Sequence, residues 1–278
     1  MITEQQRKDR QLGIGGSDIA IILGLSSYKT PYQLYLEKIG ESSEEQETPQ
    51  QYWGNRLEPI IRDEFAKRHN VAIKTPDTTI HPFHEFLRAN VDGFIPDLNA
   101  VLEVKTSSGF MTKQWGDNGS DNIPIQYLVQ VAHYCSVFDA DCAYIAVLIG
   151  GSDYREYKYT RNFEIESRII EAAKAFWKCV QERTPPLPIN QIDLRIMYPK
   201  HNPEKIKTIA PYIKTHLTEL SDIKLKIKEL GEIEEKKKFN IMRFMEDAEC
   251  LTDEAGEPLI TWKANKRGSR QFLIKGAN

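Results

Sequence analysis

Apolar residues cluster on both sides of a short polar segment within residues 91–104. The β-branched and aromatic residues there favour two strands. Residues 96–99, which include a proline, an aspartate and an asparagine, favour a turn between them. The pattern therefore predicts a β-hairpin. Because successive side chains of a strand point to opposite faces, Glu103 and Lys105 should share one face while Leu102 points to the other.

Apolar residues recur at helical spacing on both sides of this hairpin. They predict helices over residues 19–24, 31–39, 60–69, 124–136 and 163–181, and strands within residues 71–88, 142–149 and 154–159. Glycine and aspartate residues in segment 108–122 predict a loop that exposes Trp115. The order of these elements predicts an α/β fold in which helices flank a mixed central sheet.

A proline-rich segment, residues 184–188, divides the chain. It predicts a boundary between a core of residues 1–190 and an extension of residues 191–278. Residues 203–248 of the extension predict a charged helical arm, whose apolar residues keep spacings of three and four and could pack against a partner helix. Residues 259–275 predict a small β-hairpin.

Composition and charge narrow the classes of function. A chain of 278 residues that is 40% hydrophobic can bury one substantial core and a smaller appendage. A net charge of −3 argues against a uniformly basic surface, so any surface for nucleic acid must be local. The four cysteines contain no Cys-x-x-Cys pair, which favours reduced thiols over a thiolate metal site. No apolar run has membrane-spanning length and the N-terminus is unlike a signal peptide, so we expect a cytoplasmic protein without a membrane partner.

Asp92, Glu103 and Lys105 can converge on one point of the predicted hairpin. Carboxylate oxygens are the ligands that Mg²⁺ prefers, and a nearby lysine can orient a water molecule or stabilise a charged transition state. Charges on a strand whose other face is apolar are costly unless they have a function. The alternatives are a solvated antiparallel strand with alternating charges and an Asp-Gly pair that only makes a turn.

The N-terminal segment carries a second candidate site. Residues 13–18 form a glycine-rich turn before an apolar helix, so that backbone N–H groups around Gly16 could bind an anion. The hydroxyl of Ser17 and the guanidinium of Arg10 could complete a phosphate site. The alternative is a plain helix start capped by Ser17 or Asp18.

Two further helices carry candidate residues. Glu58 lies at the beginning of the helix predicted from residue 60, where the alternative is an ordinary first-turn acid favoured by the helix dipole. Tyr127 and Gln130 share one face of a later helix with Tyr134.

The predicted C-terminal hairpin is basic. Its cations are Lys263, Lys266, Arg267, Arg270 and Lys275, and the aromatic residues Trp262 and Phe272 lie among them. Basic and aromatic residues together are typical of a surface for nucleic acid, and a solvated cationic end is the alternative.

Taken in order, these motifs resemble those of the phage lambda-type exonucleases, also called YqaJ-like viral recombinases, of the PD-(D/E)xK nuclease superfamily. The resemblance covers residues 10–181. The matching motifs are Arg10 with Gly15-Gly16-Ser17-Asp18, Trp53-Gly54-Asn55-Arg56-Leu57-Glu58, Asp92 with Glu103-Val104-Lys105, and Tyr127-Leu128-Val129-Gln130. The chain departs from the superfamily name at Asn90-Val91, where a proline would stand.

The resemblance implies a restriction-endonuclease-like core and a role for each matching residue. The residues that would hold one or two Mg²⁺ ions, for which Mn²⁺ can substitute, are Asp92, Glu103, Glu58 and the carbonyl of Val104. Those that would orient the attacking water or the scissile phosphate are Lys105 and Gln130. Those that would bind the 5′-phosphate of DNA are Arg10, Ser17 and Gly16, with Tyr127 as a further DNA contact. Some relatives bind an iron–sulfur cluster through four cysteines, but the cysteine positions here do not match that set.

The implied activity is 5′-to-3′ digestion of one strand of linear double-stranded DNA, which leaves 3′ overhangs for recombination by strand annealing. The resemblance also implies a single-strand annealing protein as partner, a homo-oligomer such as a ring-shaped trimer, and a phage or prophage gene expressed in the bacterial cytoplasm. Two alternatives remain open: a structure-specific or restriction-type endonuclease of the same superfamily, and a non-catalytic DNA-end adaptor. The intact set of Asp92, Glu103 and Lys105 argues against the adaptor.

Overall fold

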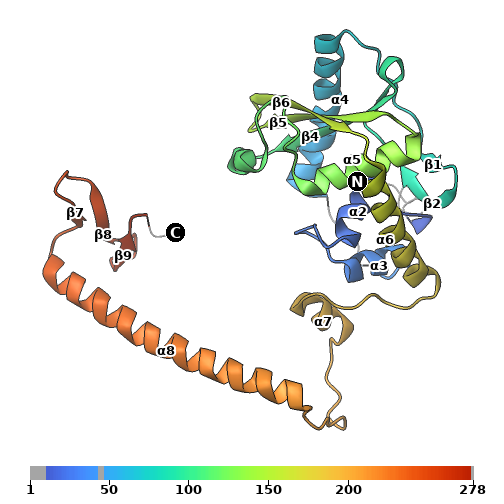
Figure 1. Ribbon diagram of the computed structural model, residues 1–278. Coiled ribbons are helices and arrows are strands. Elements are labelled where there is room, and N and C mark those ends of the chain that lie inside the picture. Colours follow the sequence, from blue (N-terminus) through green and yellow to red (C-terminus); the bar gives the residue numbers. More distant parts are fainter. Residues whose placement is uncertain (1–10, 43–46, 277–278) are drawn as a thin grey trace. The chain divides into compact units, whose positions relative to one another are not determined.

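The computed structural model of the chain describes residues 11–42 and 47–276 and consists of two compact units, Met1–His201 and Asn202–Asn278 (Figure 1). The described helices of the first unit are α2 (Gly16–Ile22), α3 (Pro31–Lys38), α4 (Pro49–His69), α5 (Ile125–Phe138), α6 (Phe163–Gln181) and α7 (Gln191–Met197). Its strands are β1 (Thr79–His81), β2 (His84–Ala89), β3 (Gly93–Ile95), β4 (Ala100–Ser107), β5 (Cys142–Ile149) and β6 (Asp153–Thr160). The second unit contains α8 (Pro211–Met245), β7 (Cys250–Thr252), β8 (Pro258–Ala264) and β9 (Arg270–Ile274).

The central sheet has the strand order β3-β4-β5-β6. β3 and β4 form the predicted hairpin, with Gly93 opposite Leu102. Its turn contains a short 3-10 helix, Pro96–Leu98, followed by Asn99 in the left-handed conformation with φ 41°. β4 and β5 run parallel, whereas β5 and β6 run antiparallel, so the predicted mixed sheet is confirmed. The parallel pair needs a crossover connection, which α5 provides.

Different helices cover the two faces of this sheet (Figure 1). α5 packs on one face together with α2 and α6, and α4 packs on the other. Along β4, Val101 belongs to the core beneath α5, whereas Leu102 and Val104 pack with Phe65 of α4. Because Glu103 has the same parity as Val101, its side chain points toward α5.

Helix α4 is longer than the sequence predicts. The predicted helix starts at residue 60, but α4 begins at Pro49. Thr48 and Gln51 form a reciprocal cap, in which each side chain accepts the backbone N–H of the other residue. Pro59 removes one backbone hydrogen bond inside the helix. Pro59 is exposed, so water can satisfy the carbonyl left unpaired, and the helix continues through a residue that usually marks a boundary.

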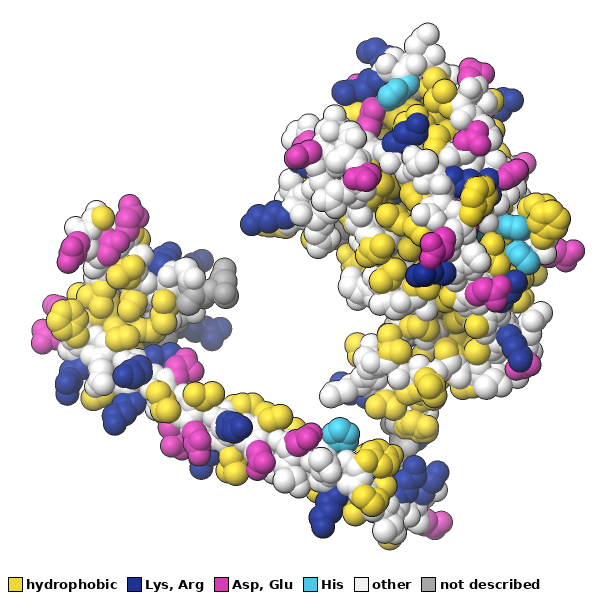
Figure 2. Space-filling view, in the orientation of Figure 1, with side chains coloured by type: hydrophobic (Ala, Val, Ile, Leu, Met, Phe, Trp, Pro, Cys, Tyr) yellow, Lys and Arg dark blue, Asp and Glu magenta, His cyan; other side chains and the backbone are white. Residues whose placement is uncertain are grey.

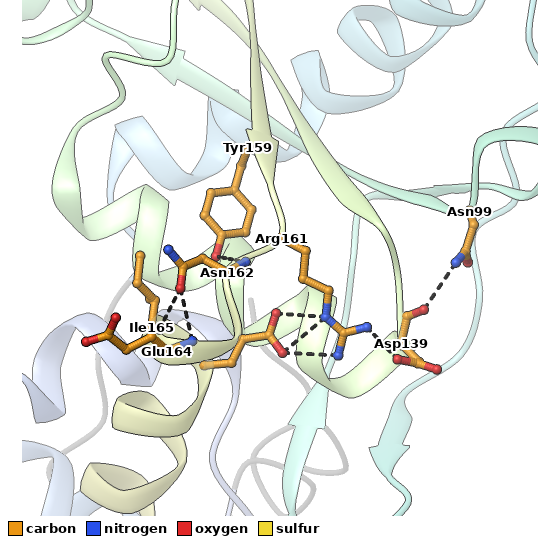
Figure 3. Close-up of polar contacts among 8 residues, drawn as sticks. Asn99, Asp139, Tyr159, Arg161, Asn162, Glu164 and Ile165 are labelled. Atoms are coloured by element: carbon orange, nitrogen blue, oxygen red, sulfur yellow. Dashed lines mark hydrogen bonds and ion pairs between the residues drawn. The ribbon is translucent and has the colours of Figure 1, made fainter.

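A polar network joins the ends of β6, α5, α6 and β4 at one edge of the core (Figure 3). The guanidinium of Arg161, which follows β6, donates to the buried carboxylate of Glu166 at 2.9–3.2 Å and pairs with Asp139, the residue after α5. Asn162 caps α6, because its side-chain oxygen accepts two N–H groups of the first turn. Asn99 donates to the Asp139 carbonyl at 3.1 Å. The network therefore holds the amino ends of β4 and β5, while Glu103 and Lys105 lie farther along β4.

Helix α7 packs within the first unit, although the boundary predicted from the sequence precedes it. Asp193 of α7 is fully buried. Its carboxylate accepts the hydroxyl of Thr30 at 2.6 Å and the N–H of Ile189 at 3.0 Å. These bonds attach α7 to the residue that caps α3, and the structure divides after His201 instead.

The second unit consists of the long helix α8 and a three-stranded antiparallel sheet in the order β7-β8-β9. The sequence predicted β8 and β9 as a hairpin and missed β7. Hydrophobic side chains are exposed along α8 and alternate with charged ones (Figure 2). In the part of the chain that the structure describes, no helix combines the length and the apolar character needed to cross a membrane.

Candidate active site

Asp92 lies where the β3–β4 ladder ends. The last pair is Gly93 opposite Leu102, and beyond it Oδ2 of Asp92 accepts the N–H of Val104 at 2.7 Å. The N–H and C=O of one strand residue point toward the same neighbouring strand, so the Val104 carbonyl also faces the Asp92 side. A carboxylate and a carbonyl oxygen are thus brought together at this end of the hairpin.

Glu103 lies beneath α5 and is 3% exposed. Nε2 of Gln130 donates to Oε1 of Glu103 at 2.6 Å and to the hydroxyl of Tyr134 at 2.9 Å. Lys105 also donates to Oε1 of Glu103. Oε2 of Glu103 is buried and has no hydrogen-bond partner among the described residues. One oxygen of this carboxylate is therefore shared by two donors, and the other is left for a further ligand.

The ring of Tyr127, which stacks on Trp115, lies beside Lys105. Nζ of Lys105 lies 5.1 Å from the centre of the Tyr127 ring, and Tyr127 stacks on Trp115 with ring centres 5.3 Å apart. The prediction that Trp115 is exposed is wrong: the side chain is 5% exposed because the ring packs between Tyr127 and Tyr157. The stacked rings support the ammonium from one side through a cation–π contact, while Glu103 binds it from another.

Glu58 reaches the same site from α4. Arg62, one helical turn later, donates to Oε1 of Glu58 at 3.2 Å and to the carbonyl of Asp92 at 3.0 Å. Glu58 lies well inside α4, so the alternative interpretation, that Glu58 is an ordinary acid in the first turn of the helix, is wrong. Arg62 was not predicted as part of the site; its spacing of four residues from Glu58 was the signal that could have found it.

Burial dominates the protonation of these groups. It raises the pKa of Glu103 to about 8, with Lys105 opposing the shift and Asp92 adding to it. It also raises the pKa of Asp92 against the charge of Lys105, and raises that of Glu58 with help from Asp92. Burial by itself would lower the pKa of Lys105, but the carboxylates of Glu103 and Asp92 outweigh it and raise that pKa. Three carboxyl groups therefore surround one ammonium, and a divalent cation would relieve their repulsion.

The donor set fits a hard metal ion in chemistry. Asp92, Glu103 and the Val104 carbonyl offer oxygen atoms, and Oε2 of Glu103 is buried without a hydrogen-bond partner in the described structure. As they stand, residues 11–42 and 47–276 contain no group of three His, Cys, Asp or Glu side chains arranged to hold a metal ion. Lys105 and Gln130 occupy the other oxygen of Glu103 in this arrangement.

The glycine-rich turn contacts α5 through Gly16. A Cβ atom at Gly16 would lie 2.4 Å from the ring of Tyr134, so only glycine allows α2 to approach α5 this closely. At the start of α2, Oδ2 of Asp18 accepts the N–H of Gly15 at 2.9 Å. The N-cap residue is Gly15 rather than Ser17 or Asp18, and Asp18, the third residue of α2, closes the helix start by accepting the Gly15 N–H.

The residues predicted to bind a 5′-phosphate have different surroundings. Gly16 is buried against Tyr134, whereas Ser17 is exposed on the first turn of α2. Arg10, the predicted phosphate clamp, lies outside the described residues.

The basic residues of the C-terminal hairpin fall into two groups. The guanidinium of Arg270 lies 3.6 Å from the centre of the Trp262 ring and donates to the Trp262 carbonyl at 3.0 Å. Lys263 pairs at 2.6 Å with the carboxylate that precedes β7. Lys266 and Arg267 lie in the exposed turn between β8 and β9. Arg270 thus has a structural role in the second unit, and the turn carries the more accessible charge.

Comparison with known proteins adds family information to this geometry. Residues 6–142 match the family described as the YqaJ-like viral recombinase domain. The chain is 39% identical over 173 residues to the uncharacterized protein YqaJ of Bacillus subtilis (strain 168), which covers 61% of this chain and 53% of that protein. The chain therefore spans about half the length of this curated relative.

Two solved structures share the fold. The alkaline exonuclease LHK-Exo from Laribacter hongkongensis aligns with a TM-score of 0.52 and 14% identity, covering 66% of this chain and 94% of the enzyme. A phage-related exonuclease from Haemophilus somnus 129PT aligns with a TM-score of 0.51 and 14% identity, covering 64% of this chain and 97% of the other. These likenesses confirm the predicted α/β fold, in which helices flank a mixed central sheet.

Proposed function

Because residues 6–142 of this chain are a YqaJ-like viral recombinase domain, we propose that the protein is a metal-dependent deoxyribonuclease. It digests one strand of linear double-stranded DNA in the 5′-to-3′ direction and leaves 3′ single-stranded overhangs. A single-strand annealing protein then uses these overhangs in phage-type recombination. The fold shared with two exonucleases supports the proposal.

The observation that carries this proposal is the convergence of Asp92, Glu103 and Lys105 at one end of the hairpin. Asp92 immediately precedes β3 and Glu103 lies on β4, where Gln130 of the overlying helix α5 binds it. Burying three charged groups and leaving one carboxylate oxygen without a hydrogen bond is costly for stability alone. A catalytic role explains why the chain retains the arrangement.

The residues that would hold Mg²⁺, or Mn²⁺ in its place, are Asp92, Glu103 and the Val104 carbonyl, with Glu58 supporting the same ion or a second one. When bound, the ion neutralises charge on the phosphate and lowers the pKa of a water molecule. Arg62 keeps Glu58 directed toward Asp92, because it binds both residues.

Lys105 and Gln130 position the reactants in this proposal. The ammonium of Lys105 donates to the attacking water or to an oxygen of the scissile phosphate, while the Tyr127 ring and Glu103 keep it in place. Gln130, held between Glu103 and Tyr134, orients the water. Hydrolysis breaks the P–O3′ bond and leaves a 5′-phosphate on the remaining strand.

Recognition of the 5′ end is assigned to Arg10, Ser17 and the backbone around Gly16. A terminal phosphate carries more negative charge than an internal one, which suits a guanidinium and exposed N–H and O–H donors. Since Asp18 closes the start of α2, the Ser17 hydroxyl is not needed as a cap. Arg10→Ala should slow digestion of 5′-phosphorylated duplexes about tenfold to a hundredfold more than that of 5′-hydroxyl duplexes. Equal slowing of both substrates would remove the end-recognition role.

The remaining parts of the proposal concern assembly and DNA guidance. The protein acts in the cytoplasm of a phage-bearing bacterium as a homo-oligomer, such as a ring-shaped trimer around DNA. Lys263, Lys266 and Arg267 guide the duplex, and Tyr127 contacts the strand near Lys105. Arg270 contributes less than its charge suggests, because it already binds Trp262.

The decisive experiment uses linear duplexes labelled at the 5′ or the 3′ end of one strand, with and without Mg²⁺. We expect metal-dependent release of mononucleotides from the 5′ end and survival of the complementary strand. Discrete internal fragments would instead identify an endonuclease. Binding without any cleavage, in Mg²⁺ or Mn²⁺, would identify a non-catalytic DNA-end adaptor.

A further inference from the structure

A pocket in the first unit, separate from the proposed active site, is lined in part by Arg88. The pocket encloses about 470 Å³ and is bounded by the N-terminal segment at Leu12, by Phe86 and Arg88 of β2, and by Lys174 and Trp177 of α6. Its lining shares no residue with the proposed active site. The volume lies within the range of pockets that bind small molecules.

Phe86 and Trp177 form an aromatic wall of this pocket. Their rings stack with centres 6.0 Å apart and an angle of 9° between the planes. Both side chains are half-buried, so part of each ring surface is accessible. Parallel, partly exposed rings offer a flat apolar surface on which another aromatic ring can pack, as a nucleobase does on protein aromatics.

Arg88 provides a positive charge in a fixed position. Its backbone carbonyl lies 2.9 Å from Nε2 of His133, which attaches this part of β2 to α5. Its Nε is buried and has no hydrogen-bond partner within the described chain. A buried donor without an acceptor is unfavourable, and a phosphate group can satisfy a guanidinium with two hydrogen bonds.

The rim adds charge and hydrogen-bonding groups. Lys174 contributes a second ammonium, whose 2.7 Å pair with Glu171 joins two exposed side chains and is therefore weak. Glu85 and Gln181 are also exposed at the rim, and Glu85 offsets part of the positive charge. The lining thus combines an aromatic wall with a net positive charge.

We propose that this pocket binds a nucleoside 5′-monophosphate unit, with the base against Phe86 and Trp177 and the phosphate on Arg88 and Lys174. The inference rests on the proposed function in one respect: an exonuclease acting on DNA releases such units as free mononucleotides, and its DNA substrate carries the same unit at the 5′ end of each strand. The pocket is nevertheless separate from the proposed active site, and its ligand is retained without cleavage.

The test is a binding titration of the full chain in EDTA, so that no strand is cleaved. The probes are dAMP, deoxyadenosine, inorganic phosphate and a 5′-phosphorylated single-stranded oligonucleotide, measured by calorimetry. The variants are Arg88→Gln, Trp177→Leu and Lys174→Gln, with Lys178→Gln as matched control, because Lys178 lies on the same helix with its side chain 70% exposed and outside the pocket. Thermal unfolding of each variant is measured alongside.

We expect dAMP to bind at least tenfold more tightly than deoxyadenosine or phosphate, because both halves of the ligand are recognised. Arg88→Gln and Trp177→Leu should each weaken dAMP about tenfold, and Lys178→Gln should not. If Arg88→Gln does not fold, Lys174→Gln, at an exposed position, tests the phosphate half in its place. If the same variants weaken binding of the oligonucleotide as much as binding of dAMP, the pocket binds strand ends. If the oligonucleotide does not bind, the pocket binds the free mononucleotide product.

Three results would overturn the inference: no binding of dAMP, binding that is unchanged in both Arg88→Gln and Trp177→Leu, or binding that is lost in Lys105→Ala and kept in Arg88→Gln. The last result would place the ligand in the proposed active site. Cleavage of labelled duplexes in Mg²⁺ is scored separately, so that dAMP binding without cleavage refutes the proposed nuclease and leaves the pocket standing.

Discussion

One buried carboxylate connects the charged groups of the candidate site. Glu103 binds Lys105 and Gln130 through the same oxygen, while its second oxygen is buried without a hydrogen bond in the described structure. Its raised pKa of about 8 results mainly from burial, and Asp92 adds to it. A cation bound there would favour the ionised form of Glu103, so that charge balance and metal binding are linked at this residue.

The carboxylates give the first prediction. Asp92→Asn and Glu103→Gln should each reduce the rate of cleavage of labelled linear duplexes by about a thousandfold or more, because an amide cannot supply the charge that binds the metal. Asp97→Asn is the control, since Asp97 belongs to the turn of the same hairpin. Thermal unfolding and DNA binding in EDTA should stay close to wild type. Near-normal turnover in either site variant would falsify the assignment.

His133 gives a prediction for stability against pH. It is fully buried on α5, and burial lowers its pKa from 6.5 to about 4 against the opposing effect of the Arg88 carbonyl. The unfolded chain binds the proton more readily than the folded one between these values. The stability due to neutral His133 is therefore complete above pH 6.5 and falls as the pH drops toward 4, by about 3 kcal/mol in total.

Urea denaturation at pH 7.5, 5.5 and 4.5 measures this effect. His133→Gln should be less stable than wild type at pH 7.5 but should lose less of its stability on acidification. The exposed His201→Gln serves as control and should retain the wild-type dependence. Parallel curves for wild type and His133→Gln would show that other groups control the acid response.

At the scale of elements, the approach of α2 to α5 connects the glycine-rich turn with β4, the strand that carries Glu103 and Lys105 of the proposed active site. Gly16 lies against the ring of Tyr134, whose hydroxyl binds Gln130, and Gln130 binds Glu103. A continuous path of packed and hydrogen-bonded side chains thus runs from the proposed end-recognition segment to β4. Displacing α2 should therefore disturb both binding and cleavage.

Gly16→Ala tests this packing. The added Cβ would meet Tyr134 at 2.4 Å, so we expect a loss of about 1–3 kcal/mol in the free energy of unfolding and lower activity. Gly15→Ala is a matched control one residue away: its nearest contact is Oδ2 of Asp18 at 3.8 Å, and its φ of −95° suits alanine. Stability of Gly15→Ala should change by less than about 0.5 kcal/mol. Urea denaturation compares the two, and equal losses would contradict the close-packing argument.

At the scale of the whole molecule, the division after His201 separates the proposed chemistry from the basic hairpin. All proposed metal and catalytic residues lie in the first unit, whereas α8 and the cations of the β8–β9 turn lie in the second. The buried bonds of Asp193 keep α7 with the first unit. A functional division of the chain should follow this boundary.

Truncation tests this division. A chain ending at His201 should still cleave short duplexes at low salt, but it should bind long DNA more weakly and with a shallower salt dependence, by roughly one unit of slope for each phosphate that it no longer binds. A chain ending at Asn190 should be less stable by about 1–3 kcal/mol, because Thr30 loses its buried acceptor. Nitrocellulose-filter binding across a salt series gives the slope. An unchanged slope would show that the hairpin does not contact DNA and is only a solvated cationic end.

Local periodicity alone determined the elements around the site. The strand-favouring residues on both sides of the turn at residues 96–99 predicted the hairpin. The strand period of two predicted the shared face of Glu103 and Lys105. Helical spacing likewise predicted that Tyr127, Gln130 and Tyr134 share a face, and the contacts of α5 with Lys105 and Glu103 confirm it. The fold class followed from the order of these elements.

Tertiary structure decided what depends on contacts between distant segments. Trp115 is buried because Tyr127 and Tyr157 approach it from other elements, and no local pattern encodes that packing. Asp193 belongs to the first unit because it meets Thr30, far away in the chain. Helix α4 passes through Pro59 because the missing hydrogen bond falls on its exposed side, a fact that only packing reveals. The periodicity of the sequence specifies which face of a helix or strand a side chain occupies. The burial of that side chain, its contact residues and the limits of helices and units depend on how the elements pack against one another.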